Sequence, residues 1–386
     1  MTPYGTFDFG LSEEQERRAR ALHRDSVVID MMFYGPASPD VWDQALADAY
    51  RAAGPQWDPM GGHRFVADEA AQGRFPSYRE LFDATGATTG IIQSALASEE
   101  WVQKAGAALE RSTSGLPWLH RVHSVDDIVS AHDNGEHALW GMCQINLVRP
   151  GELDLVDLAH DLGVLHTCDL AYNRMTFVGA GCTERYDVGL SHFGLEFVER
   201  CNRVGVVVDT AHSGRQTTLD ACAASTQPVL ATHTSAAAVY PCDRAKSDEE
   251  LVAIAGTGGV IGIYAVPFFL AAPDAPRPTV ELVLDQIEYV AQLVGWEHVG
   301  LGTDWPASDP FALLGDDFRA GVEESLRQNG FRGEHAVDIT TTLDGFSDYR
   351  DLVNVTRGLV ARGCTDEQVQ AVLGGNVLRV FERVWR

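Results

Sequence analysis

The stretch that decides the fold runs from Val204 to Arg244 and reads VGVVVDTAHSGRQTTLDACAASTQPVLATHTSAAAVYPCDR. It contains two consecutive units in which a short apolar run leads to a histidine, His212 in the first unit and His233 in the second. A helical stretch separates the two runs. Parallel strands joined by helices are typical of a barrel whose active site lies at the strand ends. The pattern therefore predicts a site where imidazoles from adjacent strands meet.

The composition sets outer limits on the function. Of 386 residues, 45% are hydrophobic and 22% are charged, as in ordinary soluble globular proteins. The 55 acidic residues exceed the 29 basic ones, and no basic run exists, which argues against nucleic acid or an anionic membrane surface as partner. The N-terminal stretch has no apolar segment of secretory type, so we expect a cytoplasmic protein. Seven cysteines without a C-x-x-C pair favour reduced thiols.

Eight apolar runs alternate with mostly helical stretches. We expect strands at 26–30, 88–96, 138–144, 164–170, 206–208, 228–231, 259–264 and 299–303. This order predicts an α/β fold of the (β/α)8 TIM-barrel type. The alternative, an open doubly wound sheet, lacks its expected glycine fingerprint between a strand and a helix.

We expect one domain over residues 1–386. An irregular insert over 34–80 forms either a lid or a passive insertion, and helices over 345–386 follow the barrel. Helices are expected to begin after a capping box at Ser12 and after Ser191. The glycine pair before Asn376 predicts a break between two helices.

Polar side chains dominate the predicted strand ends. The residues at these ends are Met32, Gln93, Gln144, Tyr172, His212, His233, Tyr264 and Asp304. A structural rim does not require so many polar groups, so this ring predicts a functional site. The sequence leaves open whether Cys143 or Gln144 faces the site.

Four ordered motifs carry a resemblance to a known family. VVVDTAHSG, PVLATHTSAAAVYPCDRAKSDEEL, HVGLGTDWP and RGCTDEQVQAVLGGNVLRVFERV resemble the signatures of the renal (membrane) dipeptidase family, peptidase family M19. The similarity begins near residue 27 and is weakest over 34–80. It implies an amidohydrolase-like barrel in which two bridged zinc ions hydrolyse dipeptides.

The metal ligands that the resemblance implies are incomplete. Met32 and Tyr34 stand where the family has a histidine and an aspartate, and Gln144 replaces a bridging glutamate, as in a divergent branch of the family. A thioether, a phenol and a neutral amide are poor zinc ligands. His212 and His233 match the two histidine ligands of the second site. We therefore expect one zinc ion rather than two, with no metal as the alternative.

Other positions match residues that contact substrate in the family. Arg244 matches an arginine that clamps the substrate carboxylate, a task suited to its planar guanidinium. Tyr172 replaces a substrate-contacting histidine, and Asp304 matches an aspartate near the substrate's amino end. The expected catalytic residues are Asp304, Tyr172 and Gln144, and the expected substrate-binding residues are Arg244, Asn173 and Tyr264.

These observations predict a dipeptidase-like metallohydrolase that cleaves the amide bond of a dipeptide or a small peptide-like metabolite. One alternative is a metal-independent lyase, isomerase or cyclase acting on an amino-acid-derived metabolite, which chelators would not inhibit. The other is a ligand-binding homologue without turnover. The sequence does not mark an oligomeric state; because related proteins are often dimers, a homodimer stays open.

Overall fold

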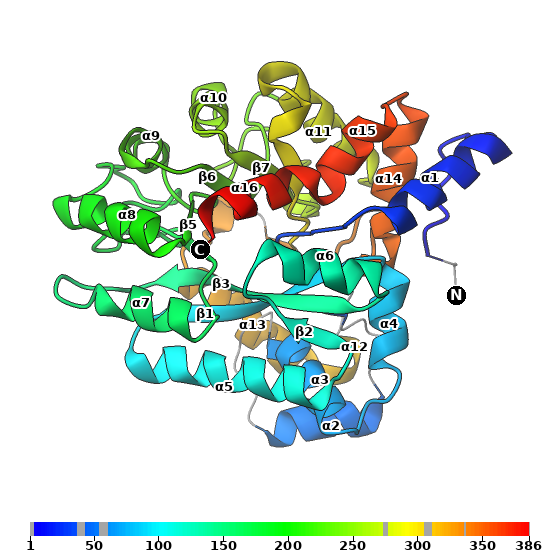
Figure 1. Ribbon diagram of the computed structural model, residues 1–386, viewed down its shortest axis with the longest axis horizontal. Helices are drawn as coiled ribbons and strands as arrows, with labels where there is room; N and C mark the ends of the chain where they lie inside the picture. Colours follow the sequence, from blue (N-terminus) through cyan, green and yellow to red (C-terminus); the bar gives the residue numbers. More distant parts are fainter. Residues whose placement is uncertain are drawn as a thin grey trace.

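A parallel sheet curled into a barrel forms the centre of the molecule, as the computed structural model shows in Figure 1. The structure describes residues 4–36, 43–53, 61–272, 277–304, 311–335 and 337–385. The strands are β1 (Thr89–Leu96), β2 (Leu119–Arg121), β3 (His137–Asn146), β4 (Thr167–Asp169), β5 (Val207–Asp209), β6 (Val229–Thr234), β7 (Val260–Ile263) and β8 (Val299–Leu301). Their order is β1-β3-β4-β5-β6-β7-β8, and β2 pairs with the first residues of β3.

The segment before β1 closes this barrel. Ile29 forms a parallel bridge to Thr89 of β1, and Asp30 forms a parallel bridge to Leu301 of β8. These bridges lie in the first predicted strand, so all eight predicted strands take part in the barrel. The predicted (β/α)8 fold is confirmed, while β2 was not predicted.

Helices surround the sheet and cover its outer face (Figure 1). They are α1 (Glu13–Asp25), α2 (Gln44–Ala52), α3 (Gly61–Ala71), α4 (Tyr78–Thr85), α5 (Glu99–Gly115), α6 (Val125–Asp133), α7 (Asp154–Asp161), α8 (His192–Val204), α9 (Arg215–Ala224), α10 (Asp248–Gly256), α11 (Glu281–Val294), α12 (Phe311–Leu314), α13 (Asp316–Gln328), α14 (Leu352–Ala361), α15 (Asp366–Gln370) and α16 (Asn376–Val384). The expected capping box at Ser12 and the cap at Ser191 are both present. None of the helices in these described ranges has the length and apolar character needed to cross a bilayer.

Two features near the insert and the C-terminus differ from the sequence prediction. The insert was expected to be irregular, but its described part forms α2 and α3, with Asp43 capping α2 through the backbone N–H of Leu46. The predicted break before Asn376 is also wrong, because a π-helix over Ala371–Gly375 runs directly into α16. A Cβ atom on Gly374 would clash with the backbone of the first barrel segment, so glycine permits close approach here rather than a break.

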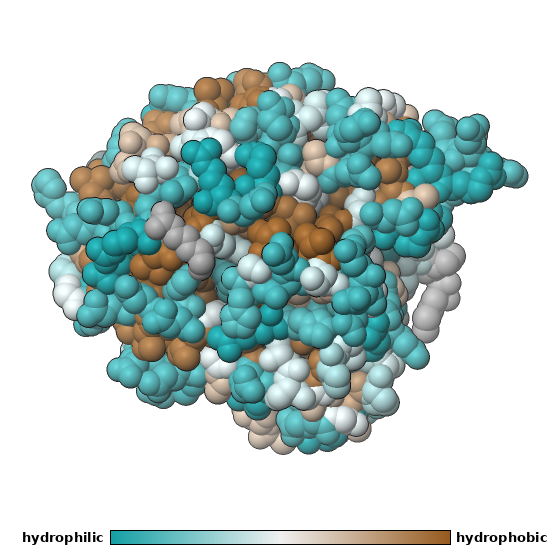
Figure 2. All heavy atoms as spheres, in the orientation of Figure 1, coloured by the Kyte–Doolittle hydropathy of each residue, from teal (hydrophilic) through white to brown (hydrophobic). Residues whose placement is uncertain are grey.

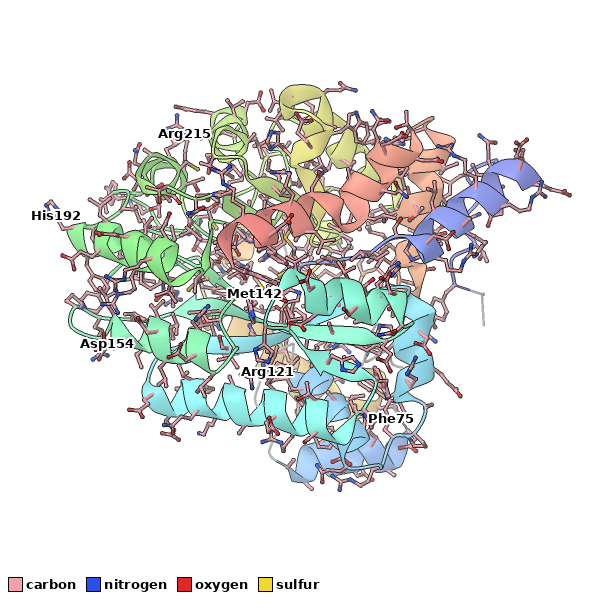
Figure 3. All side chains as sticks on the ribbon, viewed as in Figure 1. Phe75, Arg121, Met142, Asp154, His192 and Arg215 are labelled. Atoms are coloured by element: carbon pink, nitrogen blue, oxygen red, sulfur yellow. The ribbon has the colours of Figure 1, made fainter. Side chains whose placement is uncertain are left out.

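Apolar side chains fill the end of the barrel opposite the site. Met31, Val207 and Leu230 belong to one buried cluster together with Val380 and Phe381 of α16. In Figure 3, Met142 lies within the sheet, whereas His192 opens α8 at the periphery. The face shown in Figure 2 is mostly hydrophilic with small apolar areas between. The packed floor leaves the carboxyl ends of the strands as the place for a pocket.

Candidate active site

Three barrel segments each end in an aspartate, and the three aspartates form the same type of local turn. Asp30, Asp169 and Asp209 each accept a hydrogen bond from the backbone N–H two residues further on, at 3.0, 3.2 and 3.0 Å. Such an Asx turn bends the chain sharply. The residues after it reach the carboxyl end of the barrel, where Tyr172 and His212 line a pocket.

Register shifts in the sheet fall on two of the predicted site residues. Between β1 and β3 the pairing passes from Cys143 to Ile145, which leaves Gln144 as the extra residue of a bulge. Between β6 and β7 the register shifts between Ala231 and Thr234, a stretch that includes His233. Bulges redirect side chains and are common beside active sites.

The bulge settles which residue of β3 faces the site. Gln144 lines the pocket, whereas Cys143 is fully buried in the outer apolar cluster, with its Sγ 3.3 Å from the carbonyl oxygen of Ile145. A cysteine ligand at this position is therefore not available.

The two predicted imidazoles meet directly. Nε2 of His212 lies 2.9 Å from Nε2 of His233, and the side chains are 3% and 0% exposed. Burial, and next the positive charge of Arg244, hold the pKa of both imidazoles well below the ordinary value. Both rings are therefore neutral at pH 7, the state in which an imidazole binds a metal.

Hydrogen bonds on the far side of each ring orient the pair. Nδ1 of His212 lies 2.8 Å from Oδ1 of Asn173, whose Nδ2 donates to the carbonyl oxygen of Asn329 at 2.9 Å. Because Oδ1 of Asn173 must accept, Nδ1 of His212 carries its proton and Nε2 keeps a lone pair. Nδ1 of His233 lies 2.9 Å from the Thr232 hydroxyl, which donates to Asp209 at 2.6 Å.

The His212–His233 pair fits one metal ion. The Thr232 hydroxyl uses its hydrogen in the bond to Asp209, so it must accept a hydrogen bond from Nδ1 of His233. Nδ1 of His233 therefore carries the ring proton, and the lone pairs on Nε2 of His212 and Nε2 of His233 face one another. A metal ion could be bound by both lone pairs, and Nη2 of Arg244, 3.3 Å from Nε2 of His212, is the donor that faces one of them in this structure. Second hydrogen bonds of this kind are the usual support of zinc-binding histidines.

The residues at the position of a second metal ion do not fit such an ion. Tyr34 donates to Oε1 of Gln144 at 2.9 Å, Nε2 of Gln93 donates to the same oxygen at 2.6 Å, and the Met32 sulfur lies 3.9 Å from Nε2 of Gln144. The amide oxygen is already engaged, and a thioether and a phenol bind zinc poorly. Within the described ranges, no group of three or more His, Cys, Asp and Glu side chains could hold a metal ion.

Arg244 brings a buried positive charge to this pair. Its side chain is 1% exposed, with Nη2 3.3 Å from Nε2 of His212 and 3.4 Å from the carbonyl oxygen of His233, and Nη1 bonded to the carbonyl of Ala211. Its Nε has no hydrogen-bond partner among the described residues. No carboxylate of the described chain forms an ion pair with it. A buried guanidinium in this state favours binding of an anion.

Asp304 is the acidic residue that lines the pocket beyond the end of β8, and Asp68 of α3 also lines the pocket. Burial raises the pKa of the Asp304 carboxyl group to about 6; Arg244 lowers it and the nearby Asp30 raises it further. Its φ of 63° and that of Asn173, 59°, are the positive φ values found among the described non-glycine residues. Such a backbone is costly for side chains and tends to occur at functional sites.

The remaining predicted residues divide into two groups. Tyr172 lines the pocket and stacks on the His212 ring, with centroids 3.9 Å apart. Asn173 and Tyr264 are fully buried, and neither lines the pocket, so their predicted substrate contacts are not supported. Asn173 instead bonds to Nδ1 of His212, and the Tyr264 hydroxyl, one residue beyond the end of β7, lies 2.6 Å from Ser235 Oγ.

The pocket has a volume of about 630 Å³, in the range of small-molecule sites. Besides the polar residues above, apolar side chains line it, including Val266, Phe268, Phe269, Phe331, Val337 and Ile339. Phe269 lies 5.9 Å from the Arg244 guanidinium carbon, and Phe331 stacks on Phe269 at 6.0 Å. These aromatic residues were not predicted, because a single sequence does not show which loops meet over a barrel.

Solved structures share this architecture. An amidohydrolase from Pseudomonas aeruginosa is 26% identical, with a TM-score of 0.72, and the match covers 95% of this chain and 99% of the other. A metallo peptidase from Rhodobacter sphaeroides, liganded with a phosphinate mimic of the dipeptide L-Ala-D-Ala, is 19% identical, with a TM-score of 0.61 and coverage of 78% and 88%. The second likeness shows the fold alone.

Curated relatives and a family model agree with this fold. An uncharacterized dipeptidase of Schizosaccharomyces pombe is 28% identical over 276 residues, 69% of this chain and 58% of that protein. Dipeptidase verJ of Clonostachys rogersoniana is 29% identical over 239 residues, 62% and 50% of the two chains. The chain thus spans between half and three fifths of these relatives' lengths. The model "Membrane dipeptidase (Peptidase family M19)" matches residues 104–317, more than half of the sequence, and the chain therefore belongs to peptidase family M19.

Proposed function

We propose that the protein hydrolyses the amide bond of a dipeptide or a small peptide-like metabolite that carries a free carboxylate. The observation that carries this proposal is the buried Arg244, which faces the His212–His233 pair in a pocket that also holds Asp304. Arg244 can bind the carboxylate, Asp304 can act as a base, and the two imidazoles can hold a metal ion, which are roles that peptide-bond hydrolysis uses. The dipeptidase relatives support the same reaction.

The pocket also favours a class of dipeptide. The guanidinium of Arg244 would hold the terminal carboxylate by two parallel hydrogen bonds. Phe269 and Phe331 lie beside it, so the residue that carries this carboxylate meets an aromatic wall. We therefore expect a preference for a bulky apolar C-terminal residue over glycine or a charged residue.

One zinc ion bound by His212 and His233 is part of the proposal. When bound, such an ion polarises a carbonyl group and lowers the pKa of a bound water. Two imidazoles are fewer than the three protein ligands usual in catalytic zinc sites, so the ion should be easily removed. Met32, Tyr34 and Gln144 are expected to bind no second ion.

The proton transfers are assigned to the Asp304 carboxylate. Asp304, with a pKa of about 6, is mostly ionised at pH 7 and near the optimum for a general base. It takes a proton from the attacking water as the water oxygen bonds to the amide carbon. It returns that proton to the amide nitrogen as the C–N bond breaks. Tyr172 and Gln144 donate hydrogen bonds to the carbonyl oxygen, which becomes negative during the attack.

A second candidate is a metal-independent lyase, isomerase or cyclase acting on an amino-acid-derived metabolite. The neutral contacts among Met32, Tyr34 and Gln144 favour it, because these residues stand where the resemblance implies a histidine and two carboxylates of a two-metal centre. In that case His212 and Asp304 would exchange protons with the substrate directly.

Metal analysis combined with a dipeptide panel separates the two candidates. The protein is purified without a metal-affinity tag, its metal content is measured, and hydrolysis is assayed before and after chelation. The first candidate predicts about one zinc per chain, with activity lost on chelation and restored by zinc. Absence of hydrolysis for every dipeptide, with or without zinc, would refute it.

A further inference from the structure

A chain of hydrogen bonds enters the pocket from the insert. Nη1 of Arg64, on α3, donates to Oε1 of Gln93 at 3.1 Å. Nε2 of Gln93 donates to Oε1 of Gln144 at 2.6 Å, and the Tyr34 hydroxyl donates to the same oxygen at 2.9 Å. All four side chains line the pocket.

The chemistry of the guanidinium fixes the direction of this chain. A guanidinium has donors and no acceptor, so Gln93 must turn its carbonyl oxygen toward Arg64. The amide nitrogen of Gln93 then faces Gln144, which must accept this hydrogen bond with its own amide oxygen. A flipped Gln144 would set its N–H₂ group against the N–H₂ group of Gln93, two donors without an acceptor.

The nitrogen of Gln144 is therefore the group left for the pocket. Among the described residues this nitrogen donates to the Met32 sulfur at 3.9 Å, and a thioether is a weak acceptor. Gln144 is 5% exposed, so its hydrogen-bond partners rather than solvent decide which way its amide group points. An amide N–H fixed in this way is ready to donate to an incoming oxygen.

We propose that Arg64, acting through Gln93, is a positioning residue that holds Gln144 as a hydrogen-bond donor to the substrate's carbonyl oxygen. This inference rests on the proposed hydrolysis and deepens it. A carboxylate at position 144 could accept hydrogen bonds and bind cations, whereas this amide does the opposite and stabilises negative charge on the reacting oxygen. Arg64 of the insert thus contributes to catalysis through Gln93 and Gln144, and does not itself contact the reacting atoms.

Matched variants at position 64 test the direction of the chain. Arg64→Lys keeps a donor without an acceptor, whereas Arg64→Met removes the donor and frees Gln93 to turn. Protein labelled with ¹⁵N-glutamine reports each side-chain amide directly, and Gln93→Met and Gln144→Met identify the two signals. We expect both amide signals to shift in Arg64→Met and to stay near their original positions in Arg64→Lys. Unchanged signals in Arg64→Met would overturn the inference.

Ligand binding tests what the donor does. Gln93→Glu offers only oxygen atoms to Gln144, so Gln144 must turn its nitrogen away from the pocket. Calorimetry compares a phosphinate mimic of Ala-Phe, which presents a charged oxygen, with free phenylalanine, which presents only its carboxylate to Arg244. We expect the mimic to bind about 10- to 100-fold more weakly in Gln93→Glu, with phenylalanine changed less than about threefold. Equal weakening of both ligands would overturn the inference.

The two proposals fail in different ways. If hydrolysis is absent for every dipeptide while the amide signals respond to Arg64→Met, the proposed function is wrong and the positioning role stands. If dipeptides are hydrolysed and Arg64→Met keeps the original kcat and KM, Arg64 has no positioning role. With the role intact, Arg64→Met should lower kcat and leave KM nearly unchanged, and Arg64→Lys should restore kcat.

Discussion

Replacing Asp304 by asparagine should make the protein inactive and more stable at the same time. The carboxyl pKa is raised from 3.8 to about 6, mainly by burial and further by Asp30, against the lowering effect of Arg244. Asparagine is a neutral amide of the same shape, and it tolerates the φ of 63° at this position. The substitution therefore removes the charge and little else.

The magnitude follows from proton linkage. A rise of about 2 pKa units corresponds to about 3 kcal/mol of unfavourable ionisation in the folded state. Because the folded pKa lies above the unfolded one, folding loses stability as pH rises from about 4 to about 6, and the loss persists at pH 7. Asp304 is partly open to the pocket, so solvent screening reduces the expected gain for asparagine to about 1–2 kcal/mol.

Urea unfolding of both proteins at pH 4 and pH 7 measures this gain. We expect equal free energies of unfolding at pH 4 and a more stable Asp304→Asn protein at pH 7. Hydrolysis by the original protein should rise as pH passes through about 6, and the variant should lose about 100-fold or more in kcat. A variant that is less stable at pH 7, or one that retains full activity, would refute the reasoning.

Three other predictions test separate parts of the molecule. His212→Asn and His233→Asn should each reduce zinc content, measured by elemental analysis, from about one ion per chain to a small fraction, because one imidazole holds zinc weakly. Phe331→Ala should lower kcat/KM for dipeptides ending in phenylalanine about 10-fold more than for those ending in glycine, since it removes apolar contact area. Gly374→Ala should lower the free energy of unfolding by about 2 kcal/mol or more, seen in urea denaturation, because its Cβ would collide with the carbonyl oxygen of Val27.

Much of the barrel could be predicted because strand and helix patterns differ in period. Each apolar run that precedes His212, His233 or Asp304 became a strand within a few residues of its predicted bounds. The short β2 was missed because three residues carry no period. The π-helix before Asn376 was missed because a glycine pair also marks an ordinary helix end.

The site was predictable in residue type but less so in direction. Position at a strand end singled out Tyr172, His212, His233 and Asp304, and the family resemblance added Arg244, which lies against the two histidines. The orientation of Gln144 depends on a bulge, which reverses the alternation that a sequence pattern assumes. Side chains just after a strand, such as those of Asn173 and Tyr264, turn inward or outward according to a single backbone angle.

The substitutions at the first metal position form one consistent change. Met32, Tyr34 and Gln144 stand where the family resemblance implies a histidine and two carboxylates, so this side of the pocket has lost two negative charges. A site without those charges cannot offset two divalent cations, whose mutual repulsion grows where water is excluded. What remains is a chain of hydrogen bonds from Arg64 through Gln93, which in our proposal leaves the amide nitrogen of Gln144 to donate to the substrate oxygen. In the proposed hydrolysis, fixed dipoles would take over the stabilisation that a second cation gives, with His212 and His233 kept of the five ligands that the resemblance implies.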